Sequence, residues 1–174
     1  MDSGNKLMDM LTGYAAAHQH PFNIFVHMIG IPTIMLGVLI PLTWTGIEVA
    51  GLHVSLADVL LAGFFLFYLT LDIIFAVVFG VGAYLLPLLA LRLGAYPGNT
   101  GWIIAAVCFF GGYAAQFIGH AVEKSLPVLV KHPLQANLAA PFFTVVELVK
   151  FAGLRDGLFN EVQERLEQQR RSSD

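Results

Sequence analysis

The sequence predicts an all-α membrane protein, a polytopic helix bundle of about four spanning helices with interfacial or amphipathic helices at both ends. The chain of 174 residues is 57% hydrophobic and only 12% charged, whereas a soluble domain carries about 25% charged residues. No Asp, Glu, Lys or Arg occurs at 11–47, 73–91 or 93–122. Each gap offers about the 20 apolar residues that a spanning helix needs, and an open sheet could not satisfy its backbone in lipid.

The first elements are a short amphipathic helix and a long apolar one. Apolar residues at helical spacing predict the amphipathic helix at Lys6–Ala17. Pro21 suits the first turn of the first span, which is expected to end near Trp44. A polar interval, "TGIEVAGLHVSLAD", separates this span from the next.

The middle of the chain predicts three further spans. Asp72 interrupts the apolar stretch Ala57–Leu91, so two short spanning helices with a tight turn at Thr70–Ile73 are expected. "RLGAYPGNTG" is typical of a loop. The fourth span is expected to run from Thr100 to about Lys124.

The C-terminal part is less apolar. "LVKHPLQANLAAPFFTVVELVKFAGL" is compatible with a helix in the membrane interface or with a fifth, partial span. Asp156–Arg171 predicts a charged amphipathic helix. Because no repeat or low-complexity linker occurs, residues 1–174 are expected to form one integral membrane domain, with an N-terminal helix at 1–20, a bundle at 21–153 and a tail at 154–174.

The distribution of charge predicts orientation and excludes some partners. Four spans put both termini on one side, together with eight of the nine basic residues, and only Arg92 lies opposite. The positive-inside rule then makes the termini cytoplasmic. The N-terminus lacks the apolar core of a cleavable signal, and no retention tail is visible. We therefore expect a bacterial inner membrane, with the endoplasmic reticulum as the alternative. A net charge of -3 without a basic stripe argues against nucleic-acid binding, and the oligomeric state is not indicated.

Five of the six histidines gather at one membrane face in this topology, and only His53 lies across the bilayer. The five are His18, His20, His27, His120 and His132. Ionisable groups in spans are costly and mark functional sites, and imidazole suits zinc, copper, iron and nickel. The sequence therefore predicts a metal site built on His18, His27 and His120, with His132 and His20 as further candidate ligands.

Polar neighbours share the helix faces of these histidines. Asn23 lies four residues before His27, so both face one side of a helix. A second polar face on the last span consists of Gln116, His120, Glu123 and Lys124. Side chains of this kind orient metal-bound imidazoles through the other ring nitrogen.

The pattern alone leaves several functions open. A membrane di-iron hydroxylase or desaturase needs more histidines, in clustered pairs, than the six present. A non-enzymatic metal or haem carrier could use the same histidines. A structural, lipid-associated protein would bind no metal and would keep the histidines for packing or for the interface.

Two blocks of the sequence resemble the signatures of the Mpo-type 2-hydroxy fatty acid dioxygenases, a membrane family. They are "HQHPFNIFVHMIGIPTI" and "QFIGHAVEKSLPVLVKHPLQANLAAPFF". The positions of the first pattern are His18, Pro21, Asn23, His27 and Pro32. Those of the second are Phe117, Gly119, His120, Glu123 and Pro127. The resemblance extends from about Met8 to Leu154.

This resemblance implies an iron(II)-dependent dioxygenase of fatty acid α-oxidation. Its substrates would be dioxygen and a long-chain 2-hydroxy fatty acid, which becomes the acid one carbon shorter. His18, His27 and His120 occupy the family's histidine positions and would bind Fe(2+), with Glu123 as a catalytic residue. The residue pattern itself adds Asn23, Gln116, Lys124 and Lys131 as substrate-side residues, with Lys124 or Lys131 neutralising the substrate carboxylate.

Overall fold

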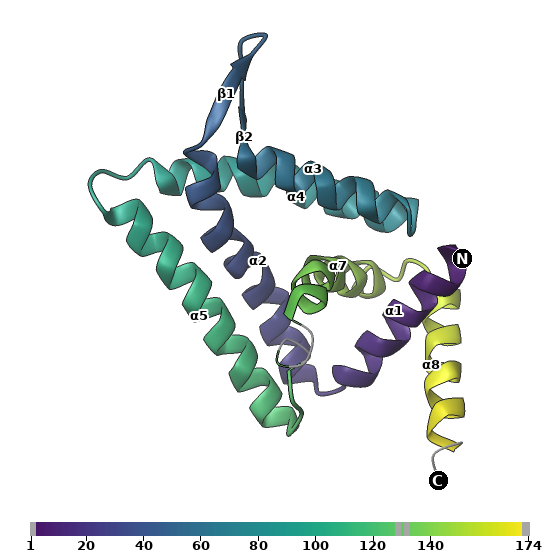
Figure 1. Cartoon of the computed structure of the whole chain (residues 1–174). Helices are drawn as coiled ribbons and strands as arrows, with labels where there is room; N and C mark the ends of the chain where they lie inside the picture. The colour runs from purple at the N-terminus through teal and green to yellow at the C-terminus, as the bar shows by residue number, and fades with distance from the viewer. Residues whose placement is uncertain (1–2, 128–129, 131–132, 172–174) are drawn as a thin grey trace.

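The computed structural model describes residues 3–127, 130 and 133–171. Its elements are α1 (Ser3–Ala17), α2 (Pro21–Thr43), β1 (Gly46–Val49), β2 (Leu52–Ser55), α3 (Leu56–Leu69), α4 (Ile73–Gly94), α5 (Thr100–Glu123), α7 (Pro133–Phe151) and α8 (Asp156–Arg171). Figure 1 shows an assembly of helices from which one small hairpin projects. The predicted all-α bundle is confirmed.

Three helices are long and apolar enough to cross a membrane, namely α2, α4 and α5. The second predicted span is the apolar helix α3, whose 14 residues reach only about 21 Å at 1.5 Å per residue. Helices α7 and α8 qualify together as a fourth candidate, but they are bent by 113° at their junction. The described residues thus offer three to four spans.

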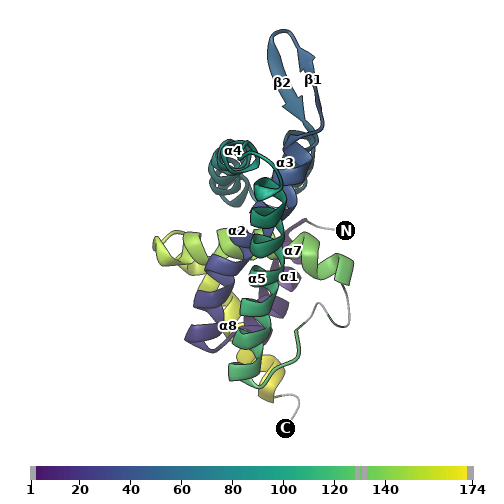
Figure 2. The ribbon, with the colours of Figure 1, turned by 90° about the vertical axis from the view of Figure 1, so that its left-hand side faces the viewer.

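Glycines let α2 and α5 pack closely along their length, side by side in Figures 1 and 2. A Cβ added at Gly37 would meet the backbone nitrogen of Phe109 at 2.6 Å and the carbonyl oxygen of Ala105 at 2.8 Å. A Cβ at Gly112 would meet the carbonyl oxygen of Gly30 at 2.9 Å. Helices in lipid associate through such small residues because apolar side chains gain little from leaving the lipid.

Replacing Gly37 with alanine is expected to destabilise the protein by about 1–3 kcal/mol. The added methyl group would meet backbone atoms of α5, which cannot rotate away as a flexible side chain can. Thermal unfolding in detergent would measure the loss. Gly82→Ala on α4 is the matched control, since a Cβ there has nothing within 4 Å. Equal stability of both variants would show that the close contact does not stabilise the bundle.

The α3–α4 pair turns at Asp72, as predicted. The Asp72 carboxylate accepts hydrogen bonds from the backbone N–H groups of Ile74 and Phe75 and so caps α4. It also forms an ion pair with Arg155, which ties this turn to the bend between α7 and α8.

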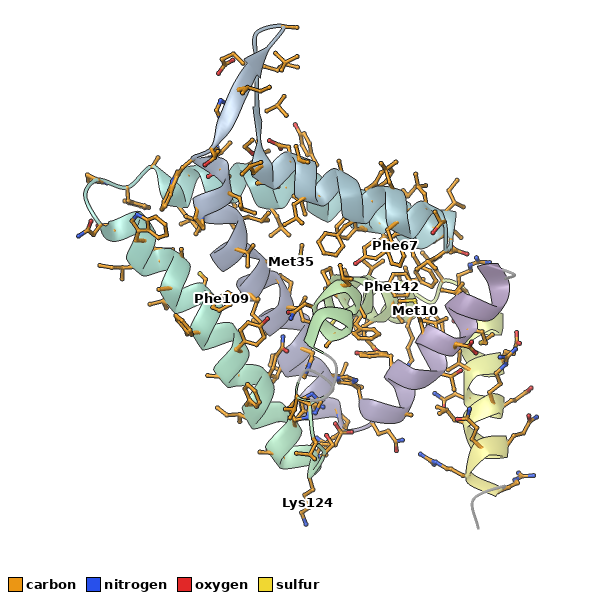
Figure 3. The ribbon with its side chains drawn as sticks, viewed as in Figure 1. Met10, Met35, Phe67, Phe109, Lys124 and Phe142 are labelled. Atoms are coloured by element: carbon orange, nitrogen blue, oxygen red, sulfur yellow. The ribbon has the colours of Figure 1, made fainter. Side chains whose placement is uncertain are left out.

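Phe142 of α7 packs on Phe75, with ring centroids 5.3 Å apart. Figure 3 shows the Phe142 side chain pointing from α7 toward the α3–α4 pair.

The interval between α2 and α3 forms an antiparallel hairpin that the sequence reading left as a polar connection. Ala50 and Gly51 make its turn with φ values of 51° and 80°. The register pairs Ile47 with Val54 and Val49 with Leu52 on one face, while Glu48 and His53 meet on the other. His53 thus lies far from the helix ends that carry the remaining described histidines.

Helices α1 and α8 lie against each other beside the bundle (Figures 1 and 2). Their bounds agree with the two amphipathic helices predicted at the ends of the chain. Val162 and Leu166 are the buried residues of α8. Through this contact the C-terminal helix supports α1, and the last turn of α1 leads directly to His18.

Candidate metal centre

The junction of α1 and α2 positions two of the predicted histidines. His18 follows the last turn of α1, and its Nδ1–H donates a hydrogen bond to the carbonyl oxygen of Tyr14 at 3.2 Å. The Tyr14 ring stacks on the imidazole at a centroid distance of 4.4 Å. His27 lies in the second turn of α2, and its Nδ1–H donates to the carbonyl oxygen of Asn23 at 2.9 Å. Both rings are therefore fixed by the backbone one turn before them.

The third histidine comes from the far end of α5. His120 lies one turn before Lys124, which ends the helix in the left-handed conformation with φ 56°. This reversal brings Ser125 back, so that its Oγ lies 2.9 Å from Nδ1 of His120. The antiparallel packing of α5 on α2 then places His120 beside His27.

The three imidazoles form one buried group. Their ring centroids are separated by 4.6 Å between His18 and His27, 5.2 Å between His18 and His120, and 5.0 Å between His27 and His120. One nitrogen of each ring lies within 4.8 Å of the corresponding atoms of the other two. Their exposed fractions are only 8%, 5% and 4%. The structure thus brings together the three histidines that the spacing selected.

The donor set fits a transition metal ion. Because every Nδ1 already has a hydrogen-bond partner, each ring has Nε2 left to offer a metal. Nε2 of His18 is buried and has no partner among the described residues, which is costly unless a ligand occupies the space. Burial lowers the pKa of His18 to about 4, so its ring is neutral at pH 7 and able to coordinate.

Glu123 holds the chain segment between His18 and His27. Its Oε1 accepts hydrogen bonds from the backbone N–H of Gln19 at 2.6 Å and of His20 at 3.0 Å. Its Oε2 accepts from the side-chain amide of Asn23. With both oxygens engaged in this way, the carboxylate links the end of α5 to the α1–α2 junction. We call Glu123 and these three donors the carboxylate clamp.

Close packing completes the clamp. Asn23 is fully buried, and a Cβ added at Gly119 would strike its Oδ1. Only a glycine leaves room for Asn23 beside α5. Asn23, Gly119 and Glu123, which all belong to the sequence blocks noted above, thus meet in one contact.

The remaining predicted residues lie in different places. His20 is exposed and caps α2, with its Nδ1 accepting from the N–H of Phe22. Gln116 lies one turn before His120, packed near Gly30, and its buried Nε2 has no partner in the described part of the chain. Lys124 is exposed and points away from the bundle (Figure 3). Lys131 and His132 lie outside the described residues.

Two partners of the centre were not predicted. Tyr14 stacks between His18 and Phe143, with centroids 3.9 Å apart in the second pair. Ser125 contacts His120 only because the helix ends in a left-handed residue. The four-residue spacing of Tyr14 and His18 was visible in the sequence, whereas the reversal after Lys124 carried no evident signal.

Comparisons with known proteins identify the family of the chain. A family model described as 2-hydroxy-palmitic acid dioxygenase Mpo1-like matches residues 5–151. The chain is also 30% identical over 173 residues to the 2-hydroxy-palmitic acid dioxygenase MPO1 of Saccharomyces cerevisiae, with 97% of this chain and 96% of the relative covered. No solved structure matches. Since the match extends over nearly the whole chain and includes all three histidines, this protein belongs to the Mpo1-like family.

Proposed function

We propose that this protein is an iron(II)-dependent dioxygenase that converts a long-chain 2-hydroxy fatty acid, with dioxygen, to the acid one carbon shorter. The observation that carries the proposal is the buried group of three imidazoles in a member of this family. Three protein nitrogens leave coordination positions open for a substrate and for oxygen, as non-haem iron oxygenases require.

In this proposal Nε2 of His18, His27 and His120 would hold the iron, which supplies the redox chemistry and the activation of oxygen. The hydrogen bonds at Nδ1 fix the ring orientations and keep the proton on the nitrogen that faces the protein. Gln116 lies one turn before His120, and its buried Nε2, which has no partner among the described residues, would donate a hydrogen bond to a polar group of the substrate. Asn23 and Glu123 would position the chain segment between His18 and His27, because the side-chain amide of Asn23 donates its hydrogen bond to the Glu123 carboxylate.

The membrane setting suits a substrate with a long acyl chain. The three apolar helices α2, α4 and α5 carry many exposed large apolar side chains, which would face lipid. The acyl chain would remain in lipid while its polar head enters from the membrane face. Cytoplasmic termini stay a prediction, and because the relative is a yeast protein, the comparison gives no support to a bacterial inner membrane.

The test is turnover of 2-hydroxypalmitate by the detergent-purified protein loaded anaerobically with iron(II). We expect consumption of oxygen and formation of pentadecanoate, measured by mass spectrometry, with palmitate as the control that lacks the 2-hydroxyl group. Iron binding without product would favour a metal carrier, and a sharp Soret band would indicate haem. Absence of metal after loading would favour a structural role and would overturn the proposal.

A further inference from the structure

A cavity of about 280 Å³ opens beside the three-histidine centre, between α1, α7 and α8. The buried ring of His18 forms part of its wall, so the cavity and the centre share one residue. The polar lining otherwise comes from Gln19, Glu147, Lys150, Gln163 and Arg170. Ile24 and Leu166 add an apolar side.

The charges of this cavity favour an anion. Arg170 is held over it by a hydrogen bond from Nη2 to Oε1 of Gln19 at 2.8 Å, a neutral partner, and forms no ion pair within the part of the chain that the structure describes. Lys150 forms no ion pair among the described residues, although its charge stabilises the nearby carboxylate of Glu147. Glu147 in turn accepts a hydrogen bond from the hydroxyl of Tyr14. Two cations therefore face one carboxylate that is already engaged.

The size of the cavity limits what it can hold. A volume of about 280 Å³ lies just below the range for sites that bind whole small molecules, roughly 300–1,000 Å³. A cavity of this size suits a charged head group and the first carbons of a chain. The remainder of a long ligand would extend past the apolar side formed by Ile24 and Leu166.

We propose that this cavity binds the carboxylate head of a long-chain fatty acid, with Lys150 and Arg170 as its cationic partners. The inference rests on the proposed function, because a head group held here lies next to His18. Lys150 and Arg170 would thus neutralise the carboxylate, a role that the sequence offered to Lys124 or Lys131. The Lys124 side chain points away from the bundle (Figure 3), and Lys131 lies outside the described residues. Arg170 lies beyond the residues 5–151 that the family model matches, so α8 would add a substrate contact to the family core.

Binding of palmitate to the metal-free protein tests the inference without turnover. We expect Lys150→Gln and Arg170→Gln each to weaken palmitate binding about tenfold, because a charge-assisted hydrogen bond is lost. Lys150→Arg should restore the affinity. The matched control is Arg171→Gln, which removes the same charge from the adjacent residue of α8, where the guanidinium lies beside Glu167. Hexadecanol, which has no charge, should bind all variants equally.

Three outcomes of these binding measurements would overturn the inference. Unchanged palmitate affinity in both cavity variants, or an equal loss in Arg171→Gln, would overturn the inference. Tighter binding of hexadecyl phosphate than of palmitate would assign the cavity to phospholipid head groups and would also overturn it. Circular dichroism and size-exclusion elution of each variant verify the fold.

The outcome separates this inference from the proposed enzyme activity. If palmitate binding falls as expected but the wild type forms no shorter acid, only the dioxygenase proposal fails. If the wild type is active and the variants keep its KM for 2-hydroxypalmitate, only the carboxylate site fails. Iron content should be unchanged in Lys150→Gln and Arg170→Gln, since neither side chain belongs to the three-histidine group.

Discussion

Replacing His120 with alanine is expected to abolish iron binding and turnover together. His120 is the contribution of α5 to the three-histidine group, and its loss leaves two nitrogens from the α1–α2 junction. Loss of groups that merely support a ligand already lowers metal affinity about 10–100-fold, so loss of a ligand itself should cost more. Elemental analysis of detergent-purified protein after anaerobic loading measures the iron, and oxygen consumption measures turnover.

His18→Ala and His27→Ala should behave in the same way, because each removes one ligand of the same centre. His53→Ala is the control, since that ring lies in the β1–β2 hairpin and contacts Glu48 instead. Retention of near-stoichiometric iron in any one of the three variants would exclude that histidine as a ligand. Loss of iron in His53→Ala as well would point to general unfolding.

Replacing Glu123 with alanine is expected to lower iron affinity about 10–100-fold, although Glu123 is not among the metal-binding atoms. The variant leaves the buried amide of Asn23 without its acceptor and frees the backbone of Gln19 and His20. The segment between His18 and His27 then loses its fixed distance from α5. An unmade hydrogen bond at a buried donor also costs about 1–3 kcal/mol of stability.

Glu123→Gln separates positioning from catalysis. Its amide oxygen can still accept from the two backbone N–H groups, and Asn23 can turn its unpaired Oδ1 toward the new amide. We therefore expect Gln to keep most of the iron affinity that Ala loses. A catalytic acid or base would instead fail equally in both variants, with normal iron content. Glu161→Ala on the surface of α8, which removes an exposed pair with Arg165, is the control.

The apolar helices and the turn at Asp72 could be predicted because their signals are local. Runs without charge gave α2, α4 and α5, and the interrupting carboxylate marked the α3–α4 turn. The β1–β2 hairpin was missed although its apolar residues alternate, because its turn has Ala50 where hairpins favour asparagine or aspartate. The end of α3 at Leu69 agrees with the short helix that was predicted before the turn at Thr70–Ile73.

The three histidines could be predicted for a different reason. Topology sends the start of α2 and the end of α5 to the same side, so His27 and His120 were expected at the same depth, and the packing of α2 on α5 brings them together. The role of Glu123 could not be predicted, because its partners are two backbone N–H groups and an amide about a hundred residues away. The cavity beside His18 depends on how α8 folds back on α1, which amphipathic spacing alone does not determine.

The metal centre combines residues 18 and 27 with residue 120, and the carboxylate clamp spans the same separation in sequence. During synthesis, the first two histidines therefore emerge and insert long before the third exists. A nascent or truncated chain that stops before α5 has only two of the three nitrogens and no Glu123 to fix the linker. In the proposed iron enzyme, tight binding of the ion would thus require a complete bundle, and chains that stop before α5 would be spared the oxidative damage that a loosely held iron ion causes.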